Sequence, residues 1–277
     1  MPMSESFQNR LFPIAEDLAQ HYGTPFHIYD ETGIRDTGRQ LNRAFAAIEG
    51  FREYFAVKAL PNPRILAIMQ DLGFGFDCSS IPELISSRQI GAHGEDIMFT
   101  SNNTTQEEFL AAAAEGGCIL NLDDISLLAK VPQFPELVCF RYNPGPRRTG
   151  NVIIGNPVEA KYGITHDQVI SAYKLALERG AKRFGIHTMV ASNETDDTYI
   201  VETARMLLQL AEMVEGQLGI RFEFLNIGGG LGIPYKPEDL PLDLDKMSGE
   251  IIDLFAEYKS THGYAPRMYM ESGRWIT

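Results

Sequence analysis

The sequence has 277 residues, of which 44% are hydrophobic and 22% are charged, and these proportions are typical of a globular protein with a sizeable core. Its formal net charge of −13 predicts an acidic surface, which disfavours binding to nucleic acid or to an anionic membrane. We expect a cytoplasmic protein without a disulfide framework, a metal site or a transmembrane helix, because the three cysteines show no paired spacing and neither a signal peptide nor a long apolar stretch is visible.

Short apolar runs alternate with longer amphipathic stretches along the chain. Strands that alternate with helices are typical of βαβ units with a parallel sheet. About eight such strands follow from residue 53 onward, and they are apolar on both faces, which favours a closed (β/α)8 barrel over an open sheet. In chain order we predict strand 25–30, helix 32–48, strand 53–59, helix 62–73, strand 75–80, helix 81–91, strand 96–101, helix 105–117, strand 118–123, helix 124–131, strand 136–145, helix 166–181, strand 183–190, helix 198–219, a strand with a glycine loop at 222–232, helix 244–263 and strand 267–274.

Polar side chains interrupt this apolar pattern at the predicted strand ends. In a (β/α)8 barrel the active site lies at the C-terminal ends of the strands. We therefore predict that these residues meet in one site: Lys58, Asp77, Arg141, His187, Gly228, Gly229, Gly230, Glu271 and Arg274.

Lys58 follows the apolar run EYFAV. A lysine on the rim of an apolar barrel would be desolvated, which favours its neutral amine. A neutral amine is a nucleophile that can form a Schiff base with an aldehyde. From this strand alone, a lysine that is paired with a carboxylate, or whose stem packs while its charge reaches water, is the alternative.

Two further strand ends offer groups that could bind a phosphate. In NIGGGLG, three successive glycines would let backbone N–H groups approach a phosphate closely, although a tight turn is the alternative. The stretch GIHTMVAS offers the hydroxyl of Ser192 for a phosphate and the ring of His187 for stacking on a flat cofactor, although a lone strand histidine is often structural.

The last predicted strand ends in ESGR. Glu271 could accept a hydrogen bond from a protonated ring nitrogen, and Arg274 could hold a phosphate or a carboxylate, although a surface ion pair is the alternative. A reactive lysine, a phosphate cradle, a carboxylate and an arginine at neighbouring strand ends together describe a site for pyridoxal 5′-phosphate (PLP).

The sequence resembles the fold type III (alanine racemase-like) PLP-dependent decarboxylases, most closely the diaminopimelate decarboxylases. The resemblance covers nearly the whole chain and rests, in order, on TPFHIYD, YFAVKAL, GFDCSSIPEL, IMFTSNNTTQEEF, LNLD, RYNPG, KYGI, GIHTMVAS, NIGGGLGIPY and ESGR. It implies that Lys58 is the Schiff-base lysine, that Asp77 lies near it and that Arg141 lies behind the cofactor ring. It also implies that Glu271 pairs with the pyridine nitrogen. The further cofactor contacts that it implies are His187, Ser192, Gly228, Gly229, Gly230, Ser272, Gly273 and Arg274, the last on phosphate or substrate.

Three features depart from the family pattern. Met189 and Ala191 replace the histidine and glycine of H-x-G-S, so either His187 or Met189 covers the ring. Ser272 stands where the family usually has proline. The family continues past ESGR into a β-domain that gives the site a cysteine, an arginine and a tyrosine, and we expect that domain to be missing here. We predict that residues 1–30 carry a strand of the β-domain region and that residues 31–277 form the barrel.

The resemblance implies an enzyme for a small amino-acid substrate. Its first expectation is decarboxylation of meso-2,6-diaminopimelate to L-lysine and CO₂, in lysine biosynthesis, by a homodimer in the full-length form. A relative that acts on D-ornithine, D-lysine or carboxynorspermidine is a second possibility, motivated by the MVAS stretch. A non-catalytic PLP-binding barrel is a third, motivated by the missing β-domain.

Overall fold

Eight parallel strands close into a barrel in the computed structural model, which describes residues 3–160, 162–236 and 238–277. The strands follow the order β4-β3-β2-β1-β9-β8-β7-β5, and β4 pairs back with β5 to close the ring. The predicted (β/α)8 barrel is thereby confirmed. The barrel strands are β1 Arg52–Ala56, β2 Gly75–Cys78, β3 Gly94–Phe99, β4 Cys118–Leu122, β5 Leu137–Asn143, β7 Arg183–Thr188, β8 Phe224–Asn226 and β9 Arg267–Met270, while the short β6 Ile164–Thr165 pairs with β5 at the rim.

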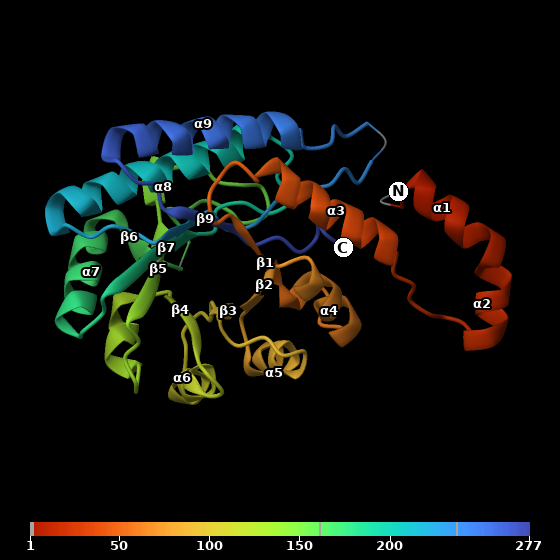
Figure 1. Ribbon diagram of the computed structural model, residues 1–277, viewed down its shortest axis with the longest axis horizontal. Helices are drawn as coiled ribbons and strands as arrows, with labels where there is room; N and C mark the ends of the chain where they lie inside the picture. The colour runs from red at the N-terminus through yellow and green to blue at the C-terminus, as the bar shows by residue number, and fades with distance from the viewer. Residues whose placement is uncertain (1–2, 161, 237) are drawn as a thin grey trace.

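Helices surround this barrel (Figure 1). Helices α8 and α9 run side by side over one side of it, α4, α5 and α6 cover the opposite side, and α1 and α2 extend away beyond α3. Within the described ranges, no helix is both long and apolar enough to cross a membrane. The helices are α1 Glu5–Leu11, α2 Ala15–Tyr22, α3 Glu31–Ala44, α4 Pro63–Asp71, α5 Ile81–Gln89, α6 Gln106–Ala113, α7 Val169–Glu178, α8 Asp197–Leu218 and α9 Leu244–His262.

Local sequence signals explain where several helices begin. The Asn62 side chain accepts a hydrogen bond from the Arg64 N–H at 2.9 Å, and proline occupies the first position of α4, where its missing N–H costs nothing. Before α6, Thr105 and Glu108 form the predicted reciprocal capping box. These caps satisfy backbone N–H groups that helix ends leave without partners.

The barrel interior changes from apolar to polar toward the C-terminal ends of the strands. Its lower part is a compact apolar cluster of Tyr54, Met98, Ile119, Leu137, Cys139, Phe224 and Tyr269. Side chains two residues apart on a strand face the same side. The next inward residues on β3, β8 and β9 are therefore Thr100, Asn226 and Glu271. The alternation of side chains along the strands thus places a layer of polar residues next to the apolar cluster, toward the C-terminal ends of the strands.

Some sequence-based predictions differ from the structure at the N-terminus. The predicted strand 25–30 is irregular and carries half-exposed Phe26, Ile28 and Tyr29, because it lies beside no strand of the described sheet with which its backbone could pair. Helices α1 and α2 were not predicted. The assignment of residues 1–30 to a β-domain region stays a prediction.

Two predicted boundaries also shift. The segment predicted as helix 124–131 is a 3-10 helix, Ile125–Lys130, with its N-cap at Asp124. Strand β1 ends at Ala56, and Val57–Ala59 form a 3-10 turn. Lys161, which opens the KYGI stretch, lies outside the described residues.

Candidate active site

A cavity of about 650 Å³ opens at the C-terminal ends of the barrel strands. Most of the predicted site residues line it, and they come from the ends of six different strands or the loops that follow them. Gly228, Gly229 and Ser272 lie next to the cavity without lining it. The predicted residues in the lining are Lys58, Asp77, Arg141, His187, Ser192, Gly230, Glu271, Gly273 and Arg274.

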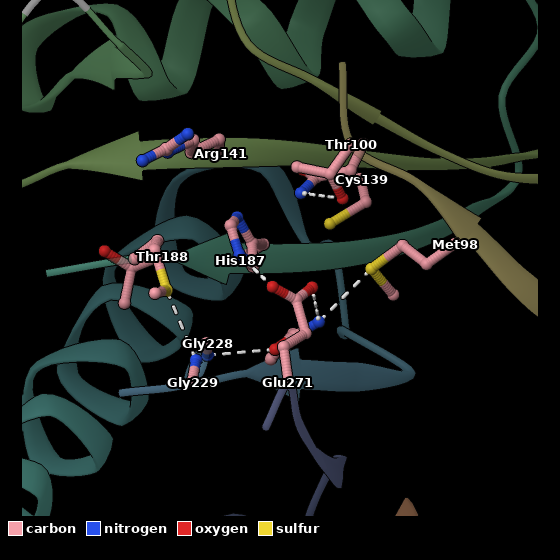
Figure 2. Close-up of polar contacts among 12 residues, drawn as sticks. Met98, Thr100, Cys139, Arg141, His187, Thr188, Gly228, Gly229 and Glu271 are labelled. Atoms are coloured by element: carbon pink, nitrogen blue, oxygen red, sulfur yellow. Dashed lines mark hydrogen bonds and ion pairs between the residues drawn. The ribbon is translucent and has the colours of Figure 1, made fainter. Parts of the chain in front are cut away.

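Glu271 is the buried acid at the centre of the site, 7% exposed (Figure 2). Asn226 Nδ2 donates to its Oε1 at 2.7 Å, and His187 Nε2 lies 3.1 Å from its Oε2. Burial acts to raise the pKa of Glu271, but the charge and hydrogen bond of His187, with the charge of Lys58 and the Asn226 hydrogen bond, outweigh it and lower the pKa below its ordinary value. Glu271 is therefore held ionised, which suits it to face a protonated ring nitrogen.

Asp77 is the second buried acid, 3% exposed, and it behaves in the opposite way. Burial and the negative charge of Glu271 raise its pKa well above the ordinary value, against the opposing charge of Lys58. Its Oδ1 atom has no hydrogen-bond partner among the described residues. A neutral carboxyl with a free oxygen is thus available to a bound ligand.

Lys58 lies on the cavity wall but is exposed. Our expectation that it is desolvated is wrong, because the 3-10 turn after β1 carries its side chain into the solvent at the cavity mouth. The described residues offer it no hydrogen bond or ion pair, so the amine is free to meet a ligand.

The glycine stretch has more than one role. Gly228 N–H donates to Asn226 Oδ1 at 2.9 Å and Gly229 N–H to Met189 Sδ at 3.3 Å, so these two amides are already used within the protein. A Cβ on Gly229 would lie 1.6 Å from the Glu271 carbonyl oxygen, so glycine is required there for the loops to pack. Only Gly230 lines the cavity, and no described acceptor takes its N–H.

Further donors for an anion surround this end of the cavity. The Ser192 hydroxyl makes no hydrogen bond in the described part of the chain, while its N–H is held by Asn151 Oδ1 at 3.3 Å. The exposed Arg274 donates to Tyr235 Oη at 2.9 Å and keeps further N–H groups for a ligand. The Gly230 amide, the Ser192 hydroxyl and Arg274 together form a candidate phosphate site.

Arg141, at the end of β5, also lines the cavity (Figure 2). Its Nη1 donates to Asn102 Oδ1 at 3.3 Å and lies 3.9 Å from Asp123 Oδ1, and its guanidinium lies 5.1 Å from the centre of the Tyr162 ring. These three partners hold the Arg141 side chain in place.

His187 and Met189, the two candidates to cover a cofactor ring, both line the cavity. Nε2 of His187 contacts Glu271, and its Nδ1 is buried without a hydrogen-bond partner among the described residues. Met189 accepts the Gly229 N–H on its sulfur and is otherwise apolar.

Sequence reasoning missed several residues of the site. Asn226 was readable in principle, because it is a polar residue at the end of an apolar strand. Thr100 and Asn102 follow β3 in the same way. Tyr235 carries no comparable signal, since it reaches Arg274 only through the fold.

The residues present fit PLP. An exposed amine lies in the same cavity as an ionised buried acid, and unpaired donors from Gly230 and Ser192 line it. The orphaned polar atoms of Asp77 and His187 are buried beside the same space. The amine suits the aldehyde of PLP, and the ionised acid suits its ring nitrogen. The unpaired donors suit its phosphate, and the buried polar atoms suit its ring substituents.

Comparison with known proteins agrees with this fit. The chain is 42% identical over its whole length to the protein TabA of Pseudomonas amygdali pv. tabaci, covering 65% of that protein. It is 34% identical to the diaminopimelate decarboxylase of Methanothermobacter thermautotrophicus, over 95% of this chain and 62% of the relative. A solved structure of diaminopimelate decarboxylase from M. jannaschii with L-lysine superposes with a TM-score of 0.85 and 27% identity, covering 95% of this chain and 63% of that one.

The chain therefore spans less than two thirds of the length of these relatives. Residues 34–277 match the family model described as pyridoxal-dependent decarboxylase, pyridoxal binding domain. The chain belongs to this family of pyridoxal-dependent decarboxylases, and its cofactor is PLP.

Proposed function

We propose that this chain is the cofactor-binding part of a PLP-dependent amino-acid decarboxylase whose first candidate substrate is meso-2,6-diaminopimelate, with L-lysine and CO₂ as products. The observation that supports this most is the ionised Glu271 buried in the same cavity as the free amine of Lys58. We further propose that the reaction serves lysine biosynthesis in the cytoplasm and that the full-length protein is a homodimer.

PLP, when bound, supplies an electron sink for the electrons that remain at the substrate Cα when CO₂ leaves. Lys58 would hold the aldehyde end of the cofactor through its amine. Glu271 would keep a proton on the ring nitrogen, since His187 and Asn226 hold the carboxylate ionised and fix both of its oxygens. Asp77, as a neutral acid, would donate a hydrogen bond near Lys58.

The phosphate would be held at the other end by Ser192, the Gly230 N–H and Arg274. We propose that Met189, and not His187, covers the ring. Nε2 of His187 is committed to Glu271, whereas Met189, whose sulfur accepts the Gly229 N–H, has a flexible apolar side chain that can pack on an aromatic face.

A different amino-acid substrate is the second candidate. The identity to TabA exceeds that to the diaminopimelate decarboxylase, and both His-to-Met and Gly-to-Ala departures lie beside the cavity at Met189 and Ala191. A barrel that binds PLP without turnover is the third candidate.

The first experiment is an absorption spectrum of the purified chain with PLP, followed by meso-diaminopimelate, D-lysine, D-ornithine or carboxynorspermidine. A visible band that changes with diaminopimelate, with release of CO₂ and lysine, would support the first candidate. A response only to another amine would support the second candidate. A band without any response would support the third.

Lys58→Ala tests the lysine assignment directly. The variant should lose the visible band, whereas the control Lys174→Ala, on the exposed face of α7, should keep it. A band that persists in Lys58→Ala would refute the assigned role of Lys58, and no band in the wild-type chain would refute the proposed site.

A further inference from the structure

Glu53 is a buried acid outside the cavity, and the proposed reaction does not use it. It is 0% exposed, on the outward face of β1, where Phe55 and Val57 belong to the large apolar core between barrel and helices. Glutamate is almost never fully buried unless it has a partner. Its position therefore requires a specific contact.

That contact is the loop that follows β9. The backbone N–H of Ser272 donates to Glu53 Oε1, and the carbonyl of Ser272 accepts the Ala56 N–H at 3.1 Å. Strand β1 thus satisfies both backbone polar groups of Ser272. The parallel pairing of Glu53 with Met270 places the acid directly beside this point.

Ser272 connects the functional groups of the loop. Glu271 precedes it, and Gly273 and Arg274 follow it, and all three line the cavity. Glu53 does not line the cavity, so it reaches the loop from behind the barrel wall. A shift of the Ser272 backbone would move Glu271 and Arg274 together.

The residue type at position 272 explains why this contact is needed. Ser272 stands where the resembled family usually has proline, which has no N–H and needs no acceptor. A serine that is only 2% exposed must place its N–H on an acceptor, and Glu53 provides one. Burial, and after it the charge of Glu271, raise the pKa of Glu53 well above its ordinary value against the opposing Ser272 hydrogen bond. The acid is therefore held neutral, and no unpaired charge is buried.

We propose that Glu53 is a positioning residue, which fixes the Ser272 backbone so that Glu271 and Arg274 face the cofactor. The inference rests on the proposed cofactor site. In this proposal the hydrogen bond from Ser272 to Glu53 restrains the loop after β9, as the proline found at this position in the resembled family would.

Trp275, the only tryptophan in the sequence, lies three residues after Ser272 and reports on this loop. Its emission and its quenching by PLP measure loop geometry and cofactor affinity together. Glu53→Leu should shift the emission and weaken PLP binding about tenfold or more, because the buried Ser272 N–H loses its acceptor. Glu53→Gln keeps an acceptor oxygen and should stay within about twofold of the wild type.

Ser272→Pro tests the same contact by removing its donor, the Ser272 N–H. In the wild-type background it leaves Glu53 without its donor, and with Glu53→Leu it removes the need for an acceptor. The double variant should therefore bind PLP more tightly than Glu53→Leu alone. Tyr173→Phe is the control, because it removes a buried hydrogen bond to the Gly185 carbonyl (2.7 Å) away from the loop and should lower stability without changing PLP affinity.

Equal PLP affinity and equal emission in Glu53→Leu and the wild type would overturn the proposal, as would strictly additive effects in the double variant. If Glu53→Leu does not fold, loss of PLP affinity in Glu53→Gln equal to that in Ser272→Pro would also overturn it. A wild-type chain that binds no PLP would refute the cofactor site instead, and the Trp275 emission would still decide the role of Glu53.

Discussion

Replacing His187 by phenylalanine should raise the pKa of Glu271. The two side chains are 1% and 6% exposed, and Nε2 lies 3.1 Å from Oε2. Phenylalanine keeps a flat ring in this space but removes both the hydrogen bond and the charge. Burial, which acts to raise the pKa of Glu271, would then be opposed only by Lys58 and Asn226.

The size of the shift follows from the two lost interactions. A hydrogen bond to a charged group contributes about 1.5–3 kcal/mol. The attraction of two charges about 4 Å apart contributes about 4 kcal/mol at an effective dielectric constant of about 20, as an upper limit once water enters. At about 1.4 kcal/mol per pKa unit, the lost hydrogen bond corresponds to a rise of about one to two units, and the lost charge adds at most about three more. His187→Gln retains a donor without the charge and should give a smaller rise.

Carbon-13 NMR of the cofactor-free protein, labelled at the glutamate carboxyl carbons, measures this pKa directly. Glu271→Gln identifies the resonance by its loss. An unchanged Glu271 pKa in His187→Phe would refute our account, since Lys58 and Asn226 would then suffice to keep the acid ionised.

Two further predictions concern folding. Gly229→Ala should lower the free energy of unfolding and abolish PLP binding, because its Cβ would lie 1.6 Å from the Glu271 carbonyl oxygen. The control Gly249→Ala, in α9, has open space around its Cβ and should raise the free energy of unfolding by about 1 kcal/mol in urea denaturation. Equal effects of the two substitutions would contradict this account of the packing at Gly229. Because the folded-state pKa of Glu53 is raised, its stabilising contribution is complete below the unfolded pKa of about 4.3 and is lost as the pH rises through the folded value. The free energy of unfolding should therefore fall less between pH 5 and pH 8 in Glu53→Gln than in the wild type, and parallel curves would show that Glu53 does not titrate as inferred.

The barrel and most of its site were predictable because their signals are local. Apolar runs of strand length marked the eight barrel strands, though not the short β6, and polar residues at their ends marked Lys58, Asp77 and Glu271. A parallel barrel brings all its strand ends to one rim, so the order of these residues along the chain is enough to group them.

The features that the sequence did not predict depend on contacts with residues far away along the chain. The stretch 25–30 has the alternation of a strand, but a strand forms only where another backbone pairs with it. The exposure of Lys58 depends on a single 3-10 turn after β1. Glu53 at the start of an apolar run reads as a surface residue, and only the return of the chain at Ser272 reveals the contact that buries it.

Asp77 and Glu271 line the cavity and Glu53 lies behind its wall, close enough for the three acids to interact, and their partners separate their protonation states. Glu271 has two donors and is held ionised, while Asp77 and Glu53 lack comparable cations and are held neutral. Three buried negative charges in this space would repel one another, so ionisation of one acid keeps the other two protonated. Environments that push neighbouring pKa values apart are how proteins assign acid and base roles. The single negative charge that remains is the one placed, by His187 and Asn226, where a ring nitrogen requires it.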